Sequence, residues 1–361
     1  MKFTYCKTYE LEAIATLRYG TPTPEEYRPE RDEVFKYPVF GTSGILGYFR
    51  KPLVKNPSPM IARKGNISGI SYSEEPFWTV DTMFFLDVDR RYVLPKFLYC
   101  MFCTKNFVKL QEGNGIPSLR RTTLNKVEFK IPSLKEQQKF LDIIDPIDEK
   151  IFLNNQLIDA LKIFGQSVVK KFSGNSVIRF EEVAGFVKGF AFPASQQTNK
   201  GFYKLLVVKN INDGFAEPDN LSKFKELSKG AKQDHILHSG DVVINFGGVV
   251  LGKVGIVFED NLLLNQKIGK IVPKIPGALP FIYFFCLTPE FLETIQKFGH
   301  GTNNFAISLA DIKGFKMPFS LSDVSAAGEK LVAPFNRIIT CRKENVMLKD
   351  LREKIFAKYL R

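Results

Sequence analysis

Arginine, lysine and amide side chains gather in glycine-rich turns of this 361-residue sequence. Arg63, Lys64 and Asn66 lie in "ARKGN", and Arg120 and Arg121 follow "GNGIPSL". Cations neutralise phosphate groups, while the forked guanidinium group and side-chain amides can form paired hydrogen bonds to base edges. A net charge of +13 favours the same kind of partner. The predicted chemistry is binding of nucleic acid, with a solvated basic turn as the alternative at each position.

The candidate contacts continue into the second half of the sequence. Asn245 and Gly247 stand where an internal repeat predicts the counterparts of Arg63 and Lys64. Because asparagine and glutamine favour adenine edges whereas arginine favours guanine, the two halves are predicted to read different sequences. The full set of candidate DNA-binding residues is Arg50, Lys51, Arg63, Lys64, Asn66, Arg120, Arg121, Asn245, Lys253, Gln266, Lys267, Asn303 and Asn304.

Signatures of catalysis are weak. "NPSP" at residues 56–59 has no aromatic ring where an amino-methyltransferase would stack a flipped base, so it is interpreted as a proline-rich turn. The glycines of residues 41–47 and 247–255 fit neither the P-loop nor the dinucleotide-binding spacing. Cys100 and Cys103 are predicted to be buried thiols of an apolar helix, and His235 and His238 surface residues. No catalytic residue and no metal site is predicted.

An internal repeat indicates which elements position these side chains. "FKIP" ending at Pro132 and "FKMP" ending at Pro318 match at an offset of 186, and "GNG" and "GHG" before them match at the same offset. "IARKGNISGISY" in the first half resembles "INFGGVVLGKVGIVF" in the second, and Gly20 aligns with Gly189. Each half is therefore predicted to be a mixed α/β domain with strand-turn-strand units and an apolar helix.

A long helical tail follows each "FK[IM]P" motif. Its apolar residues recur at alternating steps of four and three, the heptad pattern of paired helices. Pro146 and Pro334 are predicted to start or kink the main helix. Packed antiparallel, two such helices would hold two domains apart with approximate two-fold symmetry; a generic helical hairpin is the alternative. The predicted helix-helix seam comprises Phe140, Ile144, Ile147, Ile151, Ile158, Leu161, Leu331, Phe335, Ile338, Leu348 and Leu351.

The assembled parts resemble the specificity subunit of type I restriction-modification systems. "IPSLKEQQKFLDIIDPIDEKIFLNNQLIDALK" is similar to the central conserved region of that family, and residues 41–85 resemble a common form of its target-recognition domain. The resemblance covers essentially the whole chain and implies an α+β fold, with two target-recognition domains separated by two long antiparallel coiled-coil helices. The expected domains are residues 1–132 and 173–318, the central helical spacer is 133–172, and the C-terminal helix packing on it is 319–361.

The resemblance also implies a function and partners. The chain would be a non-catalytic subunit, without a cofactor of its own, that reads an asymmetric bipartite site in double-stranded DNA with one domain per half-site. Its partners would be two methyltransferase subunits, which bind S-adenosylmethionine, and restriction subunits that translocate DNA with ATP and Mg. The second tail has "FSLSDVSAAGEKL" where the family repeats a Glu-Gln helix start, so the C-terminal methyltransferase contact has weaker support.

Two rival classes stay open at this point: a stand-alone DNA-binding regulator with the same geometry, and an enzyme that modifies DNA by itself. Glu10 and Glu12 interrupt the region where a signal peptide would be apolar, and no apolar run is long enough to span a bilayer. Five cysteines at irregular positions argue against a disulfide framework. A cytoplasmic protein with no membrane partner is therefore expected.

Overall fold

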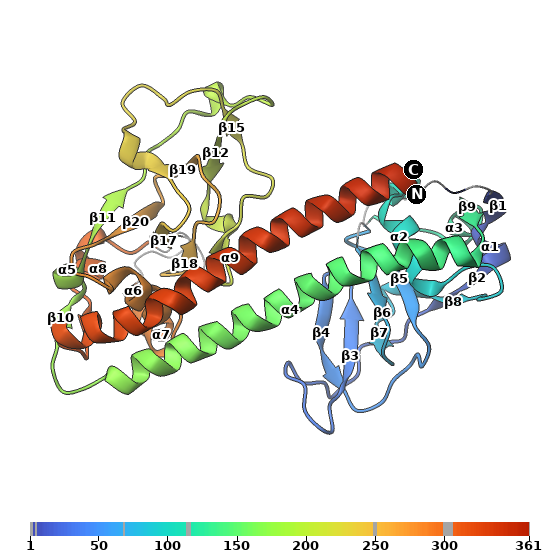
Figure 1. Ribbon diagram of the computed structural model, residues 1–361, viewed down its shortest axis with the longest axis horizontal. Coiled ribbons are helices and arrows are strands. Elements are labelled where there is room, and N and C mark those ends of the chain that lie inside the picture. Colours follow the sequence, from blue (N-terminus) through green and yellow to red (C-terminus); the bar gives the residue numbers. More distant parts are fainter. Residues whose placement is uncertain are drawn as a thin grey trace. The chain divides into compact units, whose positions relative to one another are not determined.

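The chain forms two compact units in the computed structural model, which describes residues 3, 6–67, 69–112, 117–247, 251–298 and 306–360. Unit 1 comprises residues 1–149 and 348–361, and unit 2 comprises residues 150–347. The two long helices α4 (Leu134–Phe172) and α9 (Leu321–Tyr359) each contribute to both units (Figure 1).

Unit 1 is built from short strands and short helices that precede α4. Its strands are β1 (Cys6–Glu10), β2 (Ala15–Tyr19), β3 (Tyr37–Gly41), β4 (Gly44–Phe49), β5 (Ser58–Ala62), β6 (Ile70–Ser73), β7 (Trp78–Thr79), β8 (Met83–Val88) and β9 (Glu128–Pro132). Its helices are α1 (Leu11–Ile14), α2 (Pro95–Cys103) and α3 (Arg121–Asn125), with a 3-10 turn at Phe107–Leu110.

Unit 2 repeats this order and adds further strands. They are β10 (Ile178–Arg179), β11 (Ala184–Lys188), β12 (Tyr203–Leu206), β13 (Ile211–Asn212), β14 (Phe215–Ala216), β15 (Lys223–Phe224), β16 (Ile236–Leu237), β17 (Val242–Asn245), β18 (Val254–Ile256), β19 (Leu262–Leu264), β20 (Ile268–Pro273) and β21 (Lys316–Met317). The helices are α5 (Phe180–Val183), α6 (Ala278–Cys286), α7 (Pro289–Gln296) and α8 (Leu309–Lys313), with 3-10 turns at Ala194–Gln196, Val208–Asn210 and Gln233–His235.

The two units share one sheet topology. In unit 1 a sheet has the order β2-β8-β5-β6, and in unit 2 the order β11-β20-β17-β18 continues into β14 and β13. All neighbours within these two four-strand runs are antiparallel. A second sheet repeats as well, because β3 pairs with β4 and β7 as β12 pairs with β15 and β19. The prediction of two mixed α/β domains in an internal repeat is confirmed.

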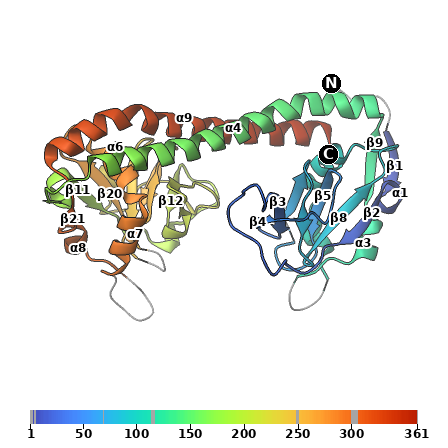
Figure 2. The ribbon, with the colours of Figure 1, turned by 90° about the horizontal axis from the view of Figure 1, so that it is seen from below.

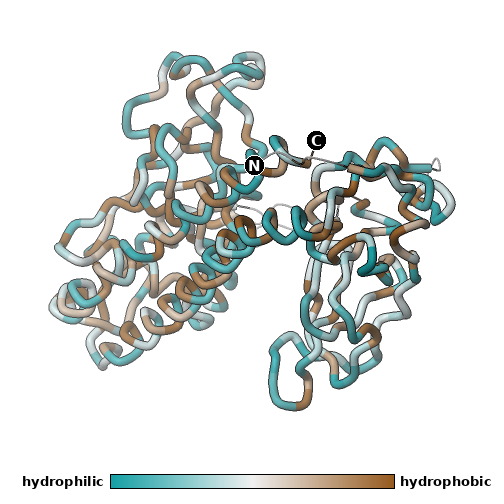
Figure 3. Tube along the Cα trace, turned by 45° about the vertical axis from the view of Figure 1, so that its right-hand side comes forward, coloured by the Kyte–Doolittle hydropathy of each residue, from teal (hydrophilic) through white to brown (hydrophobic). Residues whose placement is uncertain are grey.

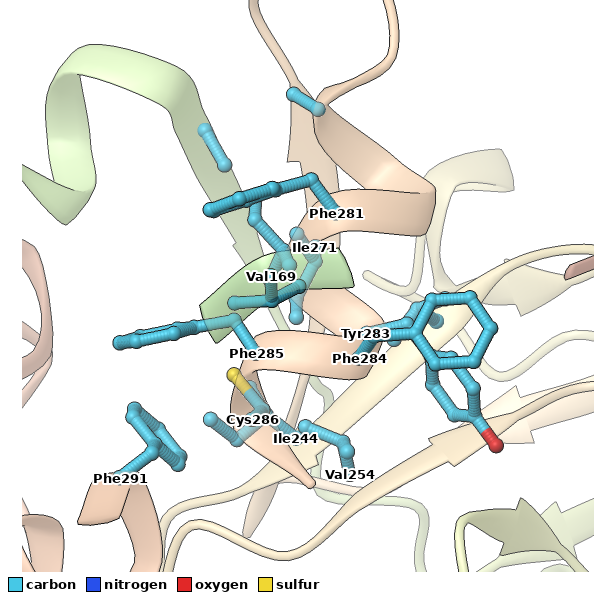
Figure 4. Packing of buried hydrophobic residues seen from close by; sticks show 14 of the residues in the cluster. Val169, Ile244, Val254, Ile271, Phe281, Tyr283, Phe284, Phe285, Cys286 and Phe291 are labelled. Atoms are coloured by element: carbon cyan, nitrogen blue, oxygen red, sulfur yellow. The ribbon is translucent and has the colours of Figure 1, made fainter. Parts of the chain in front are cut away.

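An apolar helix packs against the main sheet in each unit. In unit 2, Phe281 and Phe284 of α6 are buried with Ile244 and Ile271 of the sheet (Figure 4). A Cβ atom on Gly165 of α4 would lie 2.1 Å from the Phe284 ring, so this glycine lets α4 approach α6 closely. In unit 1 the buried side chains of α2 similarly join the first turns of α4 in one core. Aromatic side chains thus fill both cores, and each such side chain buries roughly 150–250 Å² of surface.

Hydrophilic residues predominate in the outer loops of each unit, whereas hydrophobic residues recur along the long helices (Figure 3). Among the described residues, no single helix is long and apolar enough to cross a membrane. By length and composition alone, α6 and α7 would reach that threshold together, but they are bent by 74° at the break between them.

The two long helices begin with the same capping arrangement. Ser133 and Glu136 exchange hydrogen bonds at the start of α4, as Ser320 and Asp323 do at the start of α9. Such reciprocal bonds satisfy amide groups that a helix leaves unpaired at its first turn. Both helices are 39 residues long and continue through Pro146 and Pro334. A helix start at these prolines, one of the two predicted alternatives, is therefore wrong, and a kink there stays a prediction.

The helices pack side by side and antiparallel within each unit (Figure 2). In unit 1 the ring of Phe140 lies 6.1 Å from that of Phe356. In unit 2, Asn154 contacts Asn345, and Lys330 lies over the ring of Phe172. Ten of the predicted seam residues are buried or half-buried, namely Phe140, Ile144, Ile147, Ile151, Ile158, Leu161, Leu331, Phe335, Ile338 and Leu348.

Leu351 lies outside the seam, contrary to the prediction, because its side chain is 46% exposed. Leu351 lies six residues after the buried Asn345, and six residues turn a helix by about 600°, so its side chain points about 120° away from that of Asn345. Arg352 takes the expected place and donates to Asp148 at 2.8 Å. The first residues of α4 and α9 are 187 positions apart in the sequence. At this offset Leu351 occupies the same position in α9 as Phe164 in α4, and Phe164 is exposed as well.

The β13-β14 hairpin ties the sheet of unit 2 to both long helices. Lys162 of α4 donates to the backbone oxygen of Asp213 and pairs with its carboxylate, each at 2.8 Å. The centre of the Phe215 ring lies 5.0 Å from Nζ of Lys162 and 4.9 Å from Cζ of Arg342 of α9. Arg342 also pairs with Glu217. Cations over aromatic faces are stabilising, so one ring links a strand to both helices.

Candidate nucleic-acid interface

Three strand ends meet at one corner of unit 1. Gly20, after β2, donates its backbone N–H to Met83 at 3.1 Å, and Arg63, after β5, donates its backbone N–H to Thr82 at 2.7 Å. The side chains of Tyr19, Arg63 and the β7-β8 turn are thereby brought together. This cluster of strand ends is called the reading corner below.

Arg63 is oriented within the reading corner by two contacts. Its Nε and Nη2 groups donate to the backbone oxygen of Asp81 at 3.2 and 3.0 Å. Its guanidinium lies 5.3 Å from the ring centre of Tyr19, which is half exposed and packs on Phe84. Among the described residues Nη1 has no partner, so one donor edge of a fixed, planar group stays available to a ligand.

The second basic cluster lies beside the first. The N–H of Leu119 donates to the Arg63 oxygen at 2.9 Å, and Lys64 bridges to Ser118. Arg120 therefore shares this surface with Lys64, although it is paired with Glu112 at 2.7 Å. Asn66 belongs to the same turn, and Arg121 is the exposed first residue of α3.

Arg50 and Lys51 lie away from this corner. They follow the last residue of β4, whereas the β3-β4 turn precedes its first residue. The β3-β4 turn lies close to the β5-β6 turn, because a Cβ atom on Gly69 would lie 2.4 Å from the Thr42 oxygen. A six-residue strand spans about 20 Å. Arg50 instead pairs with Glu26. The structure does not bring Arg50 and Lys51 together with the other candidates of unit 1.

Unit 2 forms the same corner with different side chains. Gly189 donates to Ile268 at 3.0 Å, and Phe246 donates to Lys267 at 2.9 Å, as Gly20 and Arg63 do in unit 1. By these matched bonds Phe246 corresponds to Arg63. By the same bonds, Gly247 corresponds to Lys64, Lys188 to Tyr19 and Gln266 to Asp81.

This correspondence corrects one predicted contact. Asn245 matches Ala62 rather than Arg63, and its side chain is fully buried in β17. Its Nδ2 group donates to the Gly247 oxygen at 3.3 Å, so it stabilises the turn. Asn245 does not reach a ligand at the surface, and its prediction as a DNA-binding residue is wrong.

The other candidates of unit 2 are dispersed. Gln266 and Lys267 are exposed at the corner, whereas Lys253 is half-buried in the turn before β18. Lys253 lines a cavity with Lys162 of α4 rather than the corner. Asn303 and Asn304, like the "GNG" and "GHG" motifs, lie outside the described residues.

Known proteins are similar to this chain in sequence and in fold. A model of the type I restriction modification DNA specificity domain matches residues 6–162 and 173–322. The chain belongs to this family. A protein of Mycoplasma pneumoniae named as a type I specificity subunit is 25% identical over 39% of this chain and 39% of its own length. The HindI type I restriction enzyme specificity subunit of Haemophilus influenzae is 31% identical over 26% of this chain and 22% of its own length.

The aligned stretches thus span well under half of these curated relatives. A solved structure supports the fold along the whole chain. The S subunit of a type I restriction-modification system from M. genitalium matches with a TM-score of 0.61 at 16% identity, over 99% of this chain and 96% of that one. In this specificity-domain chain, each matched segment contains one reading corner.

Sequence inspection missed two residues of the reading corners, Tyr19 and Lys188. Each directly precedes the glycine that aligns between the halves, Gly20 and Gly189. That glycine marks a close approach of backbones, and the residue before it is the exposed last residue of its strand. The position directly before the aligned glycine is the sequence feature that could have identified both residues.

Other groups with chemical potential play structural parts. Cys100 is buried as predicted, but Cys103 is exposed, so the prediction for that thiol is wrong. Ser58 and Pro59 open strand β5 instead of forming a turn, and the buried Ser58 hydroxyl donates to Leu86 at 2.7 Å. His238 faces Asp260 at 3.7 Å. Within the described parts of the chain, no cluster of three or more His, Cys, Asp and Glu side chains could hold a metal ion.

Proposed function

We propose that this chain is the DNA sequence-specificity subunit of a type I restriction-modification complex. Its two domains read the two halves of an asymmetric, bipartite DNA site. The observation that carries the proposal is the pair of family matches, each containing a reading corner with the same backbone and different side chains. The net charge of +13 supports attraction to a DNA backbone.

In each half-site, different residues would make the base contacts. Arg63 offers a donor edge suited to guanine, while Gln266 offers an amide suited to adenine. Lys64, Arg120 and Lys267 would neutralise phosphates around them. The other exposed candidates, Arg50, Lys51, Asn66 and Arg121, would act as more distant phosphate contacts.

The chain would act only within an assembly. Two methyltransferase subunits would supply S-adenosylmethionine chemistry, and restriction subunits would use ATP and Mg, with no cofactor in this chain. The domains would span residues 1–132 and 173–318, with helical segments 133–172 and 319–361 setting the unread gap between half-sites. A helix of 39 residues is about 58 Å long, which leaves room for such a gap. We expect the complex to work in the cytoplasm.

Methylome sequencing tests this function. A host expressing the chain with its methyltransferase subunit is compared with the same host lacking the chain. A bipartite methylated motif with a fixed gap, present only with the chain, is the expected result. Unchanged methylation, together with tight and specific DNA binding by the chain alone, would favour a stand-alone regulator. Methyl transfer by the isolated chain would favour an enzyme.

A further inference from the structure

A buried polar layer interrupts the apolar seam between α4 and α9 in unit 2. Asn154 and Asn345 are only 2% and 1% exposed, although asparagine is mostly found at protein surfaces. Ile158 and Ile338 are buried nearby in the same helices. Burying a side-chain amide costs free energy unless the amide forms hydrogen bonds, so packing alone does not account for asparagine at these two positions.

One hydrogen bond joins the two amides, and neighbouring side chains accept a further hydrogen bond from each. The Nδ2 group of Asn154 donates to Oδ1 of Asn345 at 2.9 Å and to the Glu344 carboxylate at 2.9 Å. The Nδ2 group of Asn345 donates to Oδ1 of Asn155 at 2.8 Å. Lys150 pairs with the same Glu344 carboxylate at 3.3 Å. The layer is therefore a connected network of five side chains from both helices.

This network exists in one alignment of the helices only. Because the helices are antiparallel, a shift of α9 by one turn would place Asn154 opposite Cys341 or Leu348. Asn345 would then face Ile151 or Ile158. Both amides would then be buried against apolar side chains without hydrogen-bond partners, which costs free energy. An apolar residue at the same place of a heptad seam would not carry this cost. Apolar contacts alone discriminate far less between registers that differ by one turn.

We propose that the Asn154–Asn345 pair fixes the register of α9 on α4 and thereby the number of unread base pairs between the two half-sites. The inference rests on the proposed function. A one-turn shift moves a helix by about 5.4 Å, which is about one and a half base pairs of DNA at 3.4 Å each. Asn154 and Asn345 are positioning residues for DNA reading and contact no base.

The test replaces the amides by apolar side chains of similar size in the full chain, co-expressed with its methyltransferase subunit. The variants are Asn154→Leu, Asn345→Leu and the double variant. Asn336→Leu is the matched control, because Asn336 is an exposed asparagine of the same helix. Two quantities are measured: the thermal unfolding midpoint, and methylation of duplexes whose half-sites are separated by the native gap or by one or two base pairs more or fewer.

Each single variant is expected to unfold at a lower temperature, because one amide is left buried without its partner. The double variant should recover the wild-type midpoint, since an apolar pair often replaces a buried polar pair without loss. Its preference for the native gap should nevertheless fall about tenfold, the factor given by about 1.4 kcal/mol. The control should change neither quantity.

A double variant with normal stability and the wild-type gap preference would overturn the inference and leave the proposed function intact. If wild type itself methylates no bipartite motif, the proposed function fails and the inference fails with it. A second variant, Asn345→Leu with Cys341→Asn, moves the amide by about one turn along α9 and covers the case of a double variant that does not fold. Its preferred gap should shift by one or two base pairs, and an unshifted gap would contradict the inference.

Discussion

The reading corners of the two units have the same backbone and different chemistry. Gly20 and Gly189 make equivalent bonds, and each would place a Cβ atom 2.0 Å from a carbonyl oxygen. Above this frame, unit 1 presents Tyr19 and Arg63, whereas unit 2 presents Lys188 and Gln266. The strands thus set where a side chain is offered, and the residues at their ends decide what it can recognise.

The largest expected effect comes from breaking the shared frame. Gly20→Ala and Gly189→Ala should each destabilise their own unit by about 3 kcal/mol, because backbone atoms must move to admit the methyl group. Urea unfolding of each full-chain variant measures this loss. Each change should also weaken binding to one half-site only.

Gly174→Ala is the matched control, since a Cβ atom there meets no atom within 4 Å. Equal damage to both half-sites by Gly20→Ala would contradict the separate roles of the two corners.

The next effect concerns unit 1 alone. Arg63→Ala should cost about 1–3 kcal/mol of binding to the first half-site and relax specificity at one base position. Competition binding with duplexes that vary one base pair at a time is the measurement. Arg91→Ala, which removes a largely exposed arginine of the same unit paired with Asp89, serves as the control. A uniform loss over all sequences, with a smaller salt dependence, would make Arg63 a phosphate contact instead.

A smaller effect is expected at the corner of unit 2. Gln266→Ala should lower discrimination at one base pair of the second half-site by about 1 kcal/mol. Lys188→Ala should weaken binding to all sequences alike and reduce the salt slope by about 1. Salt titrations of binding distinguish the two. If Lys188→Ala changes base preference and Gln266→Ala does not, their assigned roles are reversed.

The smallest effect tests the polar layer by pH. The hydrogen bond from Asn154, and then that from Lys150, hold the pKa of Glu344 below its ordinary value. Its contribution to stability is therefore present above the ordinary glutamate pKa of about 4.3 and is lost as the pH falls through the lowered folded value. Glu344→Gln should unfold slightly below wild type at pH 7, and the difference should close in acid. A constant difference at every pH would indicate that the charge plays no part.

Much of this architecture was predictable from the sequence. The matched "FK[IM]P" motifs and aligned glycines fix the repeat, and the heptad steps fix most of the seam. The misses have different causes: turns of different length hid the register of a strand, and a step of six residues moved one helix position out of the seam. Asn245 corresponds to Ala62, one position before Arg63, and only the hydrogen bonds between β17 and β20 reveal this. Burial rather than residue type removed Leu351 and Asn245 from the sets in which they were placed.

The β13-β14 hairpin could not be predicted, because its strands have two residues each and the described residues of unit 1 contain no counterpart that would indicate them. Tyr19 was overlooked because a lone aromatic residue at a strand end has no pattern of its own. Its part depends on Arg63, which is distant in sequence.

The closing strand pairs of the two domains have an evolutionary consequence. β1 pairs with β9 from Cys6 opposite Pro132, and β10 pairs with β21 from Ile178 opposite Met317. The chain therefore enters and leaves each domain through neighbouring strands, the arrangement that tolerates insertion of whole modules. A recombination event between two genes of this kind could exchange one domain as a cassette, leave the helices untouched and give a host a new target sequence in a single step.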